Sequence, residues 1–289
     1  MDTTTFTITS ADGEEVFVYR WAGDGDPTAI VQIAHGMGEH AARYERLAAA
    51  LVDAGYVVYA NDHRGHGRTA GDASRHGDLG KAGWAGLIDD MSALTALARE
   101  EYPGIPLVLL GHSMGSFATQ QYLLDRSDDI DAAVLSGTTA VDVIAAGIDT
   151  TRPADLSAFN AAFEPARTDY DWLSRDEAEV DLYVADPACG FGVDAEGTAQ
   201  MMSGAPALGD PEQLAGIRND LPIYVFSGDA DPLAGGGPLI DMVADRYRAA
   251  GVEDVTVRLY PGARHETFNE TNRNEVTADL IDWLDRVTA

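Results

Sequence analysis

The chain of 289 residues is 45% apolar, enough for a sizeable core, and its formal net charge is −29, with Lys81 as the only lysine. Such an acidic surface repels phosphate backbones and anionic lipid headgroups, so we expect no nucleic-acid partner and no stable membrane insertion. The single cysteine, Cys189, excludes an intrachain disulfide framework, and the N-terminus has no signal-peptide pattern, so we expect a soluble cytoplasmic protein. The acidity indicates either adaptation to salt or ordinary drift of a solvated surface, and both interpretations stay open.

Two segments of alternating residues, 5–9 and 15–19, flank the turn Ala11-Asp-Gly13 and predict an antiparallel hairpin. A repeated strand and helix rhythm follows, which predicts a mostly parallel sheet flanked by helices. The expected strands are 30–33, 57–60, 107–110, 132–136, 223–227 and 255–260. The expected helices are 44–54, 84–102, 239–250 and 275–287, with a further one opening after residue 113.

Between about residues 137 and 221 this rhythm breaks down into short helical pieces and prolines. The stretch is too long for an ordinary connection, and its aromatic and methionine side chains favour a folded insertion over disorder. We therefore divide the chain into an α/β core, residues 1–137 and 222–289, and a largely helical cap, residues 138–221.

The pentapeptide Gly111-His-Ser-Met-Gly115 stands between an apolar strand and the start of a helix. That is the pattern of a nucleophile elbow, in which Ser113 sits on a sharp turn and glycines flank it because a Cβ would collide there. The pattern alone is loose, so the assignment depends on partners for the serine.

A serine hydroxyl needs a base to take its proton and a carboxylate to orient that base. His265 is the only histidine after Ser113 and lies in a turn after the last expected strand. The carboxylate comes from Gly228-Asp-Ala-Asp231, where Asp229 and Asp231 compete. We favour Asp231, on grounds of motif, and expect Asp229 to hold the turn by accepting backbone N–H groups.

Acyl transfer also needs two donors for the developing oxyanion. One is the N–H group of Met114, directly after the serine, and the other is expected from the loop His35-Gly-Met-Gly-Glu-His40. Glycines let this loop approach the elbow, and we choose the N–H group of Met37.

Metal ligation by His63 and His66 is the other possibility that the histidines raise. Their loop is rich in glycine and lacks a convincing third ligand, so a structural turn is the favoured interpretation.

Five motifs in this order, over nearly the whole chain, resemble the α/β-hydrolase superfamily, in its monoacylglycerol lipase and bacterial lysophospholipase branch of serine aminopeptidase S33-type hydrolases. They are His35-Gly-Met-Gly-Glu-His40, Asp62-His-Arg-Gly-His-Gly67, Gly111-His-Ser-Met-Gly115, Gly228-Asp-Ala-Asp231 and Arg264-His-Glu266. The resemblance implies an eight-stranded sheet, no cofactor or metal, and a cap inserted after the sixth strand.

The resemblance also implies substrate-binding positions. Glu39 and Arg43 match residues that shape the polar end of the site in monoacylglycerol lipases, whereas Phe268 stands where the animal enzymes have a second histidine. The stretch around Phe268 is instead similar to bacterial lysophospholipase-type enzymes.

We therefore predict a carboxylic ester hydrolase in which Ser113, Asp231 and His265 form the catalytic set and the Met37 and Met114 amides bind the oxyanion. The expected substrate is a monoacylglycerol-like or other lipid monoester. The alternatives are a lysophospholipase, an aminopeptidase-type or other small-ester hydrolase, and a non-catalytic small-molecule-binding protein on the same fold. Nothing in the sequence indicates the oligomeric state.

Overall fold

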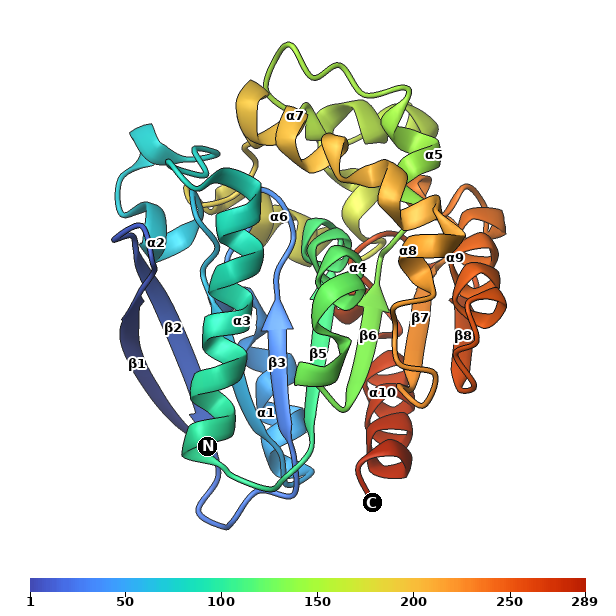
Figure 1. The fold of residues 1–289 in the computed structure, drawn as a ribbon. Helices are drawn as coiled ribbons and strands as arrows, with labels where there is room; N and C mark the ends of the chain where they lie inside the picture. The colour runs from blue at the N-terminus through green and yellow to red at the C-terminus, as the bar shows by residue number, and fades with distance from the viewer.

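A computed structural model describes all residues, 1–289, and its centre is one sheet of eight strands in the order β1-β2-β4-β3-β5-β6-β7-β8 (Figure 1). The strands are β1 (Asp2–Thr9), β2 (Glu15–Ala22), β3 (Ile30–Ala34), β4 (Val57–Asn61), β5 (Leu107–His112), β6 (Ala132–Ser136), β7 (Ile223–Gly228) and β8 (Val255–Tyr260). Strands β1 and β2 are antiparallel to their neighbours and every later pair is parallel. The mostly parallel sheet predicted from the sequence is confirmed.

The hairpin of β1 and β2 forms one edge of the sheet, with Thr5 paired to Tyr19. β1 is largely exposed, which accounts for its threonine-rich alternation, whereas β3, β4, β5, β6 and β7 are buried along their whole length. Parallel strands covered on both faces need near-continuous apolar runs, and this is the pattern that made them visible in the sequence.

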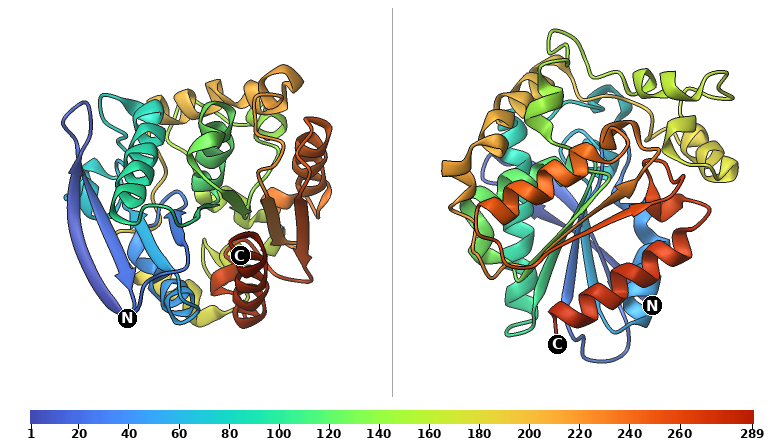
Figure 2. Two further views of the ribbon diagram at one scale, coloured as in Figure 1. Left: turned by 60° about the horizontal axis from the view of Figure 1, so that its bottom comes forward. Right: turned by 90° about the vertical axis from the view of Figure 1, so that its right-hand side faces the viewer.

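Helices cover both faces of the sheet (Figure 2). The helices outside the segment between β6 and β7 are α1 (Glu45–Asp53), α2 (Gly67–Ala70), α3 (Gly83–Glu101), α4 (Met114–Arg126), α9 (Pro238–Ala249) and α10 (Arg273–Val287). Short 3₁₀ turns lie at η1 (Ala41–Tyr44), η2 (Ala73–Arg75), η3 (Ser127–Asp129), η7 (Pro232–Ala234) and η8 (Thr267–Asn269).

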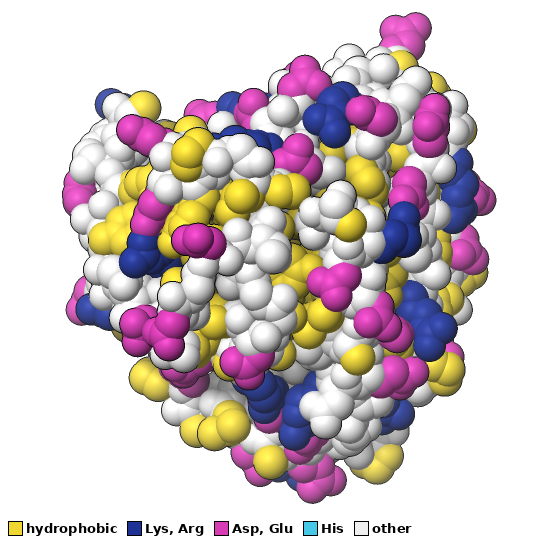
Figure 3. Space-filling view, turned by 90° about the horizontal axis from the view of Figure 1, so that it is seen from below, with side chains coloured by type: hydrophobic (Ala, Val, Ile, Leu, Met, Phe, Trp, Pro, Cys, Tyr) yellow, Lys and Arg dark blue, Asp and Glu magenta, His cyan; other side chains and the backbone are white.

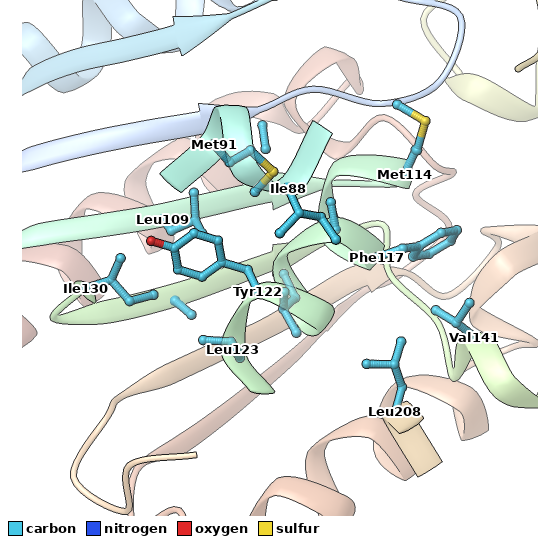
Figure 4. Close-up of a cluster of buried hydrophobic side chains, with 14 of the residues drawn as sticks. Ile88, Met91, Leu109, Met114, Phe117, Tyr122, Leu123, Ile130, Val141 and Leu208 are labelled. Carbon is cyan, nitrogen blue, oxygen red and sulfur yellow. The ribbon is translucent and has the colours of Figure 1, made fainter. Parts of the chain in front are cut away.

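Two apolar cores lie on opposite faces of the sheet because successive strand residues point to opposite sides. Leu109 of β5 belongs to the core under α3, α4 and α9, and Leu110 belongs to the core under α1 and α10. Figure 4 shows the first core, where Phe117 and Tyr122 of α4 lie among side chains from α3, β5 and the segment after β6. The serine at the junction of β5 and α4 is thus anchored by packing on its helical side.

The segment between β6 and β7 lies above the carboxyl ends of the parallel strands (Figure 1). It consists of α5 (Val141–Ala145), η4 (Leu156–Phe163), η5 (Asp171–Leu173), α6 (Glu177–Ala185), α7 (Ala195–Ser203), η6 (Ala205–Gly209) and α8 (Pro211–Leu214). We call it the inserted segment. It packs on the core through contacts of α7 with α3 and of η6 with α4.

The surface carries acidic side chains interspersed with arginines, as the face in Figure 3 shows. Many arginines form ion pairs, of which Arg286 with Asp254, at 2.6 Å, is a typical exposed one. Pairs of this kind contribute little to stability and leave most of the negative charge uncompensated. No helix is both long enough and apolar enough to span a bilayer.

Candidate active site

Ser113 stands between β5 and α4 and is the one non-glycine residue with a positive φ, at φ 52° and ψ −121°. The flanking glycines permit this turn, because a Cβ on Gly115 would lie 2.1 Å from the carbonyl oxygen of Ala34 and one on Gly111 would lie 2.4 Å from that of Gly115. The backbone thus makes the sharp turn from strand to helix that the sequence pattern predicts.

His265 and Asp231 form a buried pair, with His265 Nδ1 2.9 Å from Asp231 Oδ2. Burial alone would lower the pKa of His265, but the Asp231 carboxylate, with smaller contributions from Glu266 and Glu39, outweighs it and the pKa lies above its usual value. The converse holds for Asp231. Burial alone would raise the pKa of its carboxyl group, but His265 and the other groups around it lower that pKa below its usual value. The two shifts agree in favouring an ionised carboxylate beside the imidazole.

The Asp231 carboxylate is held by two further donors, Ser227 Oγ at 2.7 Å and the N–H group of Leu233 at 2.9 Å. Asp229, the competing candidate, instead accepts the N–H group of Gly262 at 2.6 Å in an exposed position. The structure therefore places Asp231 at the histidine and Asp229 in the turn.

Ser113 and His265 line the same cavity, and no hydrogen bond joins their side chains in this structure. Catalytic hydrogen bonds are often loose in the absence of substrate, so the arrangement is compatible with a serine and base pair. The indole of Trp172, from the inserted segment, packs on the imidazole of His265 with ring centroids 4.7 Å apart.

The loop after β3 passes close to the serine, since a Cβ on Gly36 would lie 3.2 Å from Ser113 Cβ. The backbone N–H groups of Met37 and Met114 donate to no other protein group. We call residues 36–40 the oxyanion loop, after the role proposed for them below.

Beneath this loop lies a buried polar cluster around Glu39. Its carboxylate accepts the N–H group of Gly36 at 2.6 Å, Arg43 at 2.6 Å and the hydroxyl of Tyr44 at 2.8 Å. Burial would raise the pKa of Glu39, but Arg43, the nearby His112 and the Gly36 and Tyr44 donors together outweigh it, and the pKa is lowered. Arg43 also forms a bidentate pair with Glu266, at 2.6 and 2.7 Å. One guanidinium thus joins the oxyanion loop to the residue after His265.

The three predicted substrate-binding residues occupy different places. Glu39 lines the cavity that holds Ser113, whereas Arg43 and Phe268 line only a small crevice behind it. Phe268 is buried and packs edge-on against Phe226, with ring centroids 5.6 Å apart. It therefore belongs to the core under the site.

The cavity at Ser113 has a volume of about 190 Å³ and is mostly apolar. Glu39 and Glu266 lie at its lining together with His265. The inserted segment contributes much of the apolar wall, through Ile144, Ile148, Leu156, Phe159, Met201 and Met202. The cavity thus offers a nucleophile and carboxylates beside a wall suited to an alkyl chain.

Three further histidines near the oxyanion loop are buried and uncharged. Burial lowers the pKa values of His35 and His66 to about 3, and that of His63 well below its usual value, so all three rings stay neutral. His40, Asp186 and Cys189 are the one group of side chains whose possible metal-ligating atoms lie within 4.8 Å of one another. His40 Nε2 lies 2.9 Å from Asp186 Oδ2, so these two side chains already pair with each other, at the contact between the oxyanion loop and the inserted segment.

Sequence reasoning missed Glu266 and Tyr183 as lining residues of the cavity. Glu266 could have been found from the sequence, because it directly follows the predicted base. Tyr183 could not, since its position at the cavity depends on how a stretch without a regular strand and helix pattern folds back over the core.

An eight-stranded sheet of this order, with a strained serine after β5 and a histidine and aspartate pair facing its cavity, defines the class of α/β-hydrolases. The chain belongs to the family described as "Serine aminopeptidase, S33", whose family model matches residues 25–272.

Relatives with named functions are similar over most of their length. A monoacylglycerol lipase of Mycolicibacterium smegmatis is 34% identical over 271 residues, covering 91% of this chain and 90% of that protein. The human monoglyceride lipase is 28% identical, covering 98% of this chain and 90% of that protein. Among solved structures, a thermostable carboxyl esterase from Bacillus coagulans in complex with glycerol has a TM-score of 0.90, 27% identity and full coverage of both chains. The chain is therefore an α/β-hydrolase of the esterase and lipase type.

Proposed function

We propose that the protein is a serine carboxylic ester hydrolase that cleaves lipid monoesters resembling monoacylglycerols through an acyl-enzyme. The observation that carries this proposal is the meeting, at one apolar cavity, of the strained Ser113 and the buried pair of His265 and Asp231. Strain of this kind points the hydroxyl out of the turn, where an ester carbonyl can reach it.

In the proposed mechanism, Ser113 Oγ attacks the ester carbonyl carbon while His265 Nε2 takes the hydroxyl proton. Asp231 holds Nδ1–H of the imidazole and stabilises the imidazolium that forms. The N–H groups of Met37 and Met114 bind the oxyanion, each contributing about 3 kcal/mol by the precedent of other serine hydrolases. His265 then returns the proton to the leaving alcohol. A water molecule, activated by His265 in the same way, attacks the acyl-enzyme and releases the acid and free Ser113.

The shape of the cavity and the named relatives support this substrate class. We propose that residues 138–221 act as a cap, because their side chains form the apolar wall against which one acyl chain would lie. The polar end, with Glu39 and Glu266, suits a hydroxylated alcohol, in keeping with relatives named as monoacylglycerol lipases. Arg43 and Phe268 would support this end from behind.

An aminopeptidase activity is the second candidate, favoured by the family description and by the two carboxylates at the cavity. A substrate amine would need uncompensated negative charge. Arg43 binds both Glu39 and Glu266, which leaves less charge for an amine than two free carboxylates would offer. The ester substrate is therefore the better fit.

A panel of substrates tests the proposal. Monoacylglycerols and p-nitrophenyl esters of increasing chain length would be compared with lysophospholipids and aminoacyl amides, using the wild-type protein and Ser113→Ala. We expect preference for monoacyl esters, loss of activity in Ser113→Ala, and labelling of the wild type alone by a fluorophosphonate. Preference for aminoacyl amides would favour the peptidase, and an unlabelled wild type would indicate a binding protein.

A further inference from the structure

We propose that Tyr183 of the inserted segment is a positioning residue for the oxyanion loop, whose Gly38 carbonyl its hydroxyl holds so that the N–H group of Met37 points at the reacting carbonyl. The inference rests on the proposed function and adds a residue to it. It makes the inserted segment part of the catalytic apparatus as well as a wall for the acyl chain.

The inserted segment contacts the Gly38 carbonyl directly, through two hydrogen bonds. The Tyr183 hydroxyl donates to the carbonyl oxygen of Gly38 at 2.8 Å, and the N–H group of Gly190 donates to the same oxygen at 3.0 Å. Both donors come from the inserted segment, and Tyr183 is only 3% exposed. No donor from the core holds this carbonyl.

Gly38 follows Met37, so the orientation of its peptide is tied to that of the proposed oxyanion donor. Its φ is +64°, and a Cβ there would lie 2.3 Å from the carbonyl oxygen of Phe191. The loop is therefore closely covered by the backbone of the inserted segment. Loss of the Tyr183 hydroxyl would leave this carbonyl with the N–H group of Gly190 as its only donor, and the weaker restraint lets a flexible glycine peptide rotate.

Two neighbouring groups pack against the Tyr183 ring. Its ring centroid lies 5.0 Å from that of Tyr170, and the Arg43 guanidinium lies 4.8 Å above it. Burial raises the pKa of the Tyr183 hydroxyl well above its usual value, so the group stays a donor over the whole working range of pH. The ring is thus a fixed support for Gly38.

The two proposed oxyanion donors consequently have separate supports. Met114 is the first residue of α4 and is held by the core. Met37 lies in a loop in which the carbonyl of the following residue, Gly38, is held by Tyr183, 145 positions later in the chain. Loss of the Tyr183 hydroxyl should therefore weaken one donor and leave the other, the nucleophile and the His265 pair in place.

The test compares Tyr183→Phe with the wild type, and with Tyr170→Phe as the matched control. Tyr170 is the neighbouring tyrosine, and its hydroxyl donates to the carbonyl of Gly190 at 2.7 Å, one step further from the loop. We expect kcat to fall about tenfold in Tyr183→Phe with KM within about twofold, since removal of a whole oxyanion donor lowers kcat by about 10²–10³ and here one donor is only misaligned. Tyr170→Phe should change kcat by less than about threefold.

Two readouts separate positioning from other roles. Binding of a trifluoromethyl ketone, which mimics the oxyanion, should weaken by the same factor as kcat, and the fall should be equal for esters of glycerol, methanol and p-nitrophenol. Circular dichroism and the melting temperature would show that both variants are folded.

Unchanged kcat in Tyr183→Phe, or an unchanged inhibitor affinity, would overturn the inference while leaving the proposed function intact. A fall confined to one alcohol would overturn it as well, by indicating direct contact with substrate. A wild type that hydrolyses no ester would overturn both.

Discussion

Replacing Ser113 by glycine should stabilise the protein while abolishing its activity. The serine holds φ 52° and ψ −121°, a conformation that glycine adopts freely and that costs other residues about 1–3 kcal/mol. Ser113→Ala removes the same hydroxyl but keeps the Cβ, so the alanine variant is the matched control. The difference between the two variants isolates the backbone strain from the loss of the nucleophile.

The size of the effect follows from two opposing terms. Relief of about 1–3 kcal/mol of strain is offset by about 0.4–1 kcal/mol for the greater freedom of glycine in the unfolded chain. We therefore expect Ser113→Gly to be about 1 kcal/mol more stable than Ser113→Ala. For 289 residues at about 2.1 cal/mol/K each, this is a rise of about 1.6 °C in melting temperature.

Differential scanning calorimetry of both variants in one buffer measures this difference, and hydrolysis of p-nitrophenyl esters checks that both are inactive. A melting temperature of Ser113→Gly equal to or below that of Ser113→Ala would refute the argument that the turn stores strain.

Three further results are expected. Asp231→Asn should lower kcat by about 10³–10⁴, because an amide facing His265 favours the wrong tautomer, and the control is an unchanged circular dichroism spectrum. Glu266→Gln should move the acid limb of the profile of kcat/KM against pH to lower pH. The Glu266 carboxylate helps to raise the pKa of His265, so its loss lets the base become neutral at a lower pH. Glu275→Gln, which changes an exposed carboxylate, is the control and should leave the limb in place. About 1 M NaCl should raise the melting temperature by screening a net charge of −29, and an unchanged or lower value would contradict adaptation to salt.

The fold was predictable where the burial of an element produces a simple hydrophobic pattern in its sequence. The buried parallel strands β3 to β7 appeared as largely apolar runs and the partly exposed β8 as an alternating one, and the strands at 132–136 and 255–260 have the predicted bounds. Helix ends shifted by one or two residues, as at α3, which begins at Gly83 and ends at Glu101. The short 3₁₀ turns of the inserted segment have no hydrophobic period that would reveal them, so only the folded character of this stretch could be expected.

The candidate site was predictable where local sequence fixes geometry. The elbow turn needs glycines on either side of Ser113, at Gly111 because of Gly115 in the same turn and at Gly115 because of the neighbouring strand β3. Asp231 caps η7 through Leu233, so the direction of its side chain is set close to β7. Tyr183 differs, because its position at Gly38 depends on the packing of a distant helix. A single sequence does not reveal contacts between such distant residues, because the spacing of residue types within each segment does not depend on them.

Phe268 shows why substrate choice is harder to predict than reaction class. The family resemblance implied that Phe268, three residues after His265, is a substrate-binding residue, yet η8 turns its side chain into the core against Phe226. The cavity is bounded instead by Glu266, adjacent to the base, and by methionines of α7 such as Met201. Methionine side chains adapt their shape to what they contact. For the lipid monoesters proposed as substrates, a wall of this kind would tolerate several acyl lengths, so the sharper selection should come from the proposed polar end, where Arg43 fixes two carboxylates in rigid geometry.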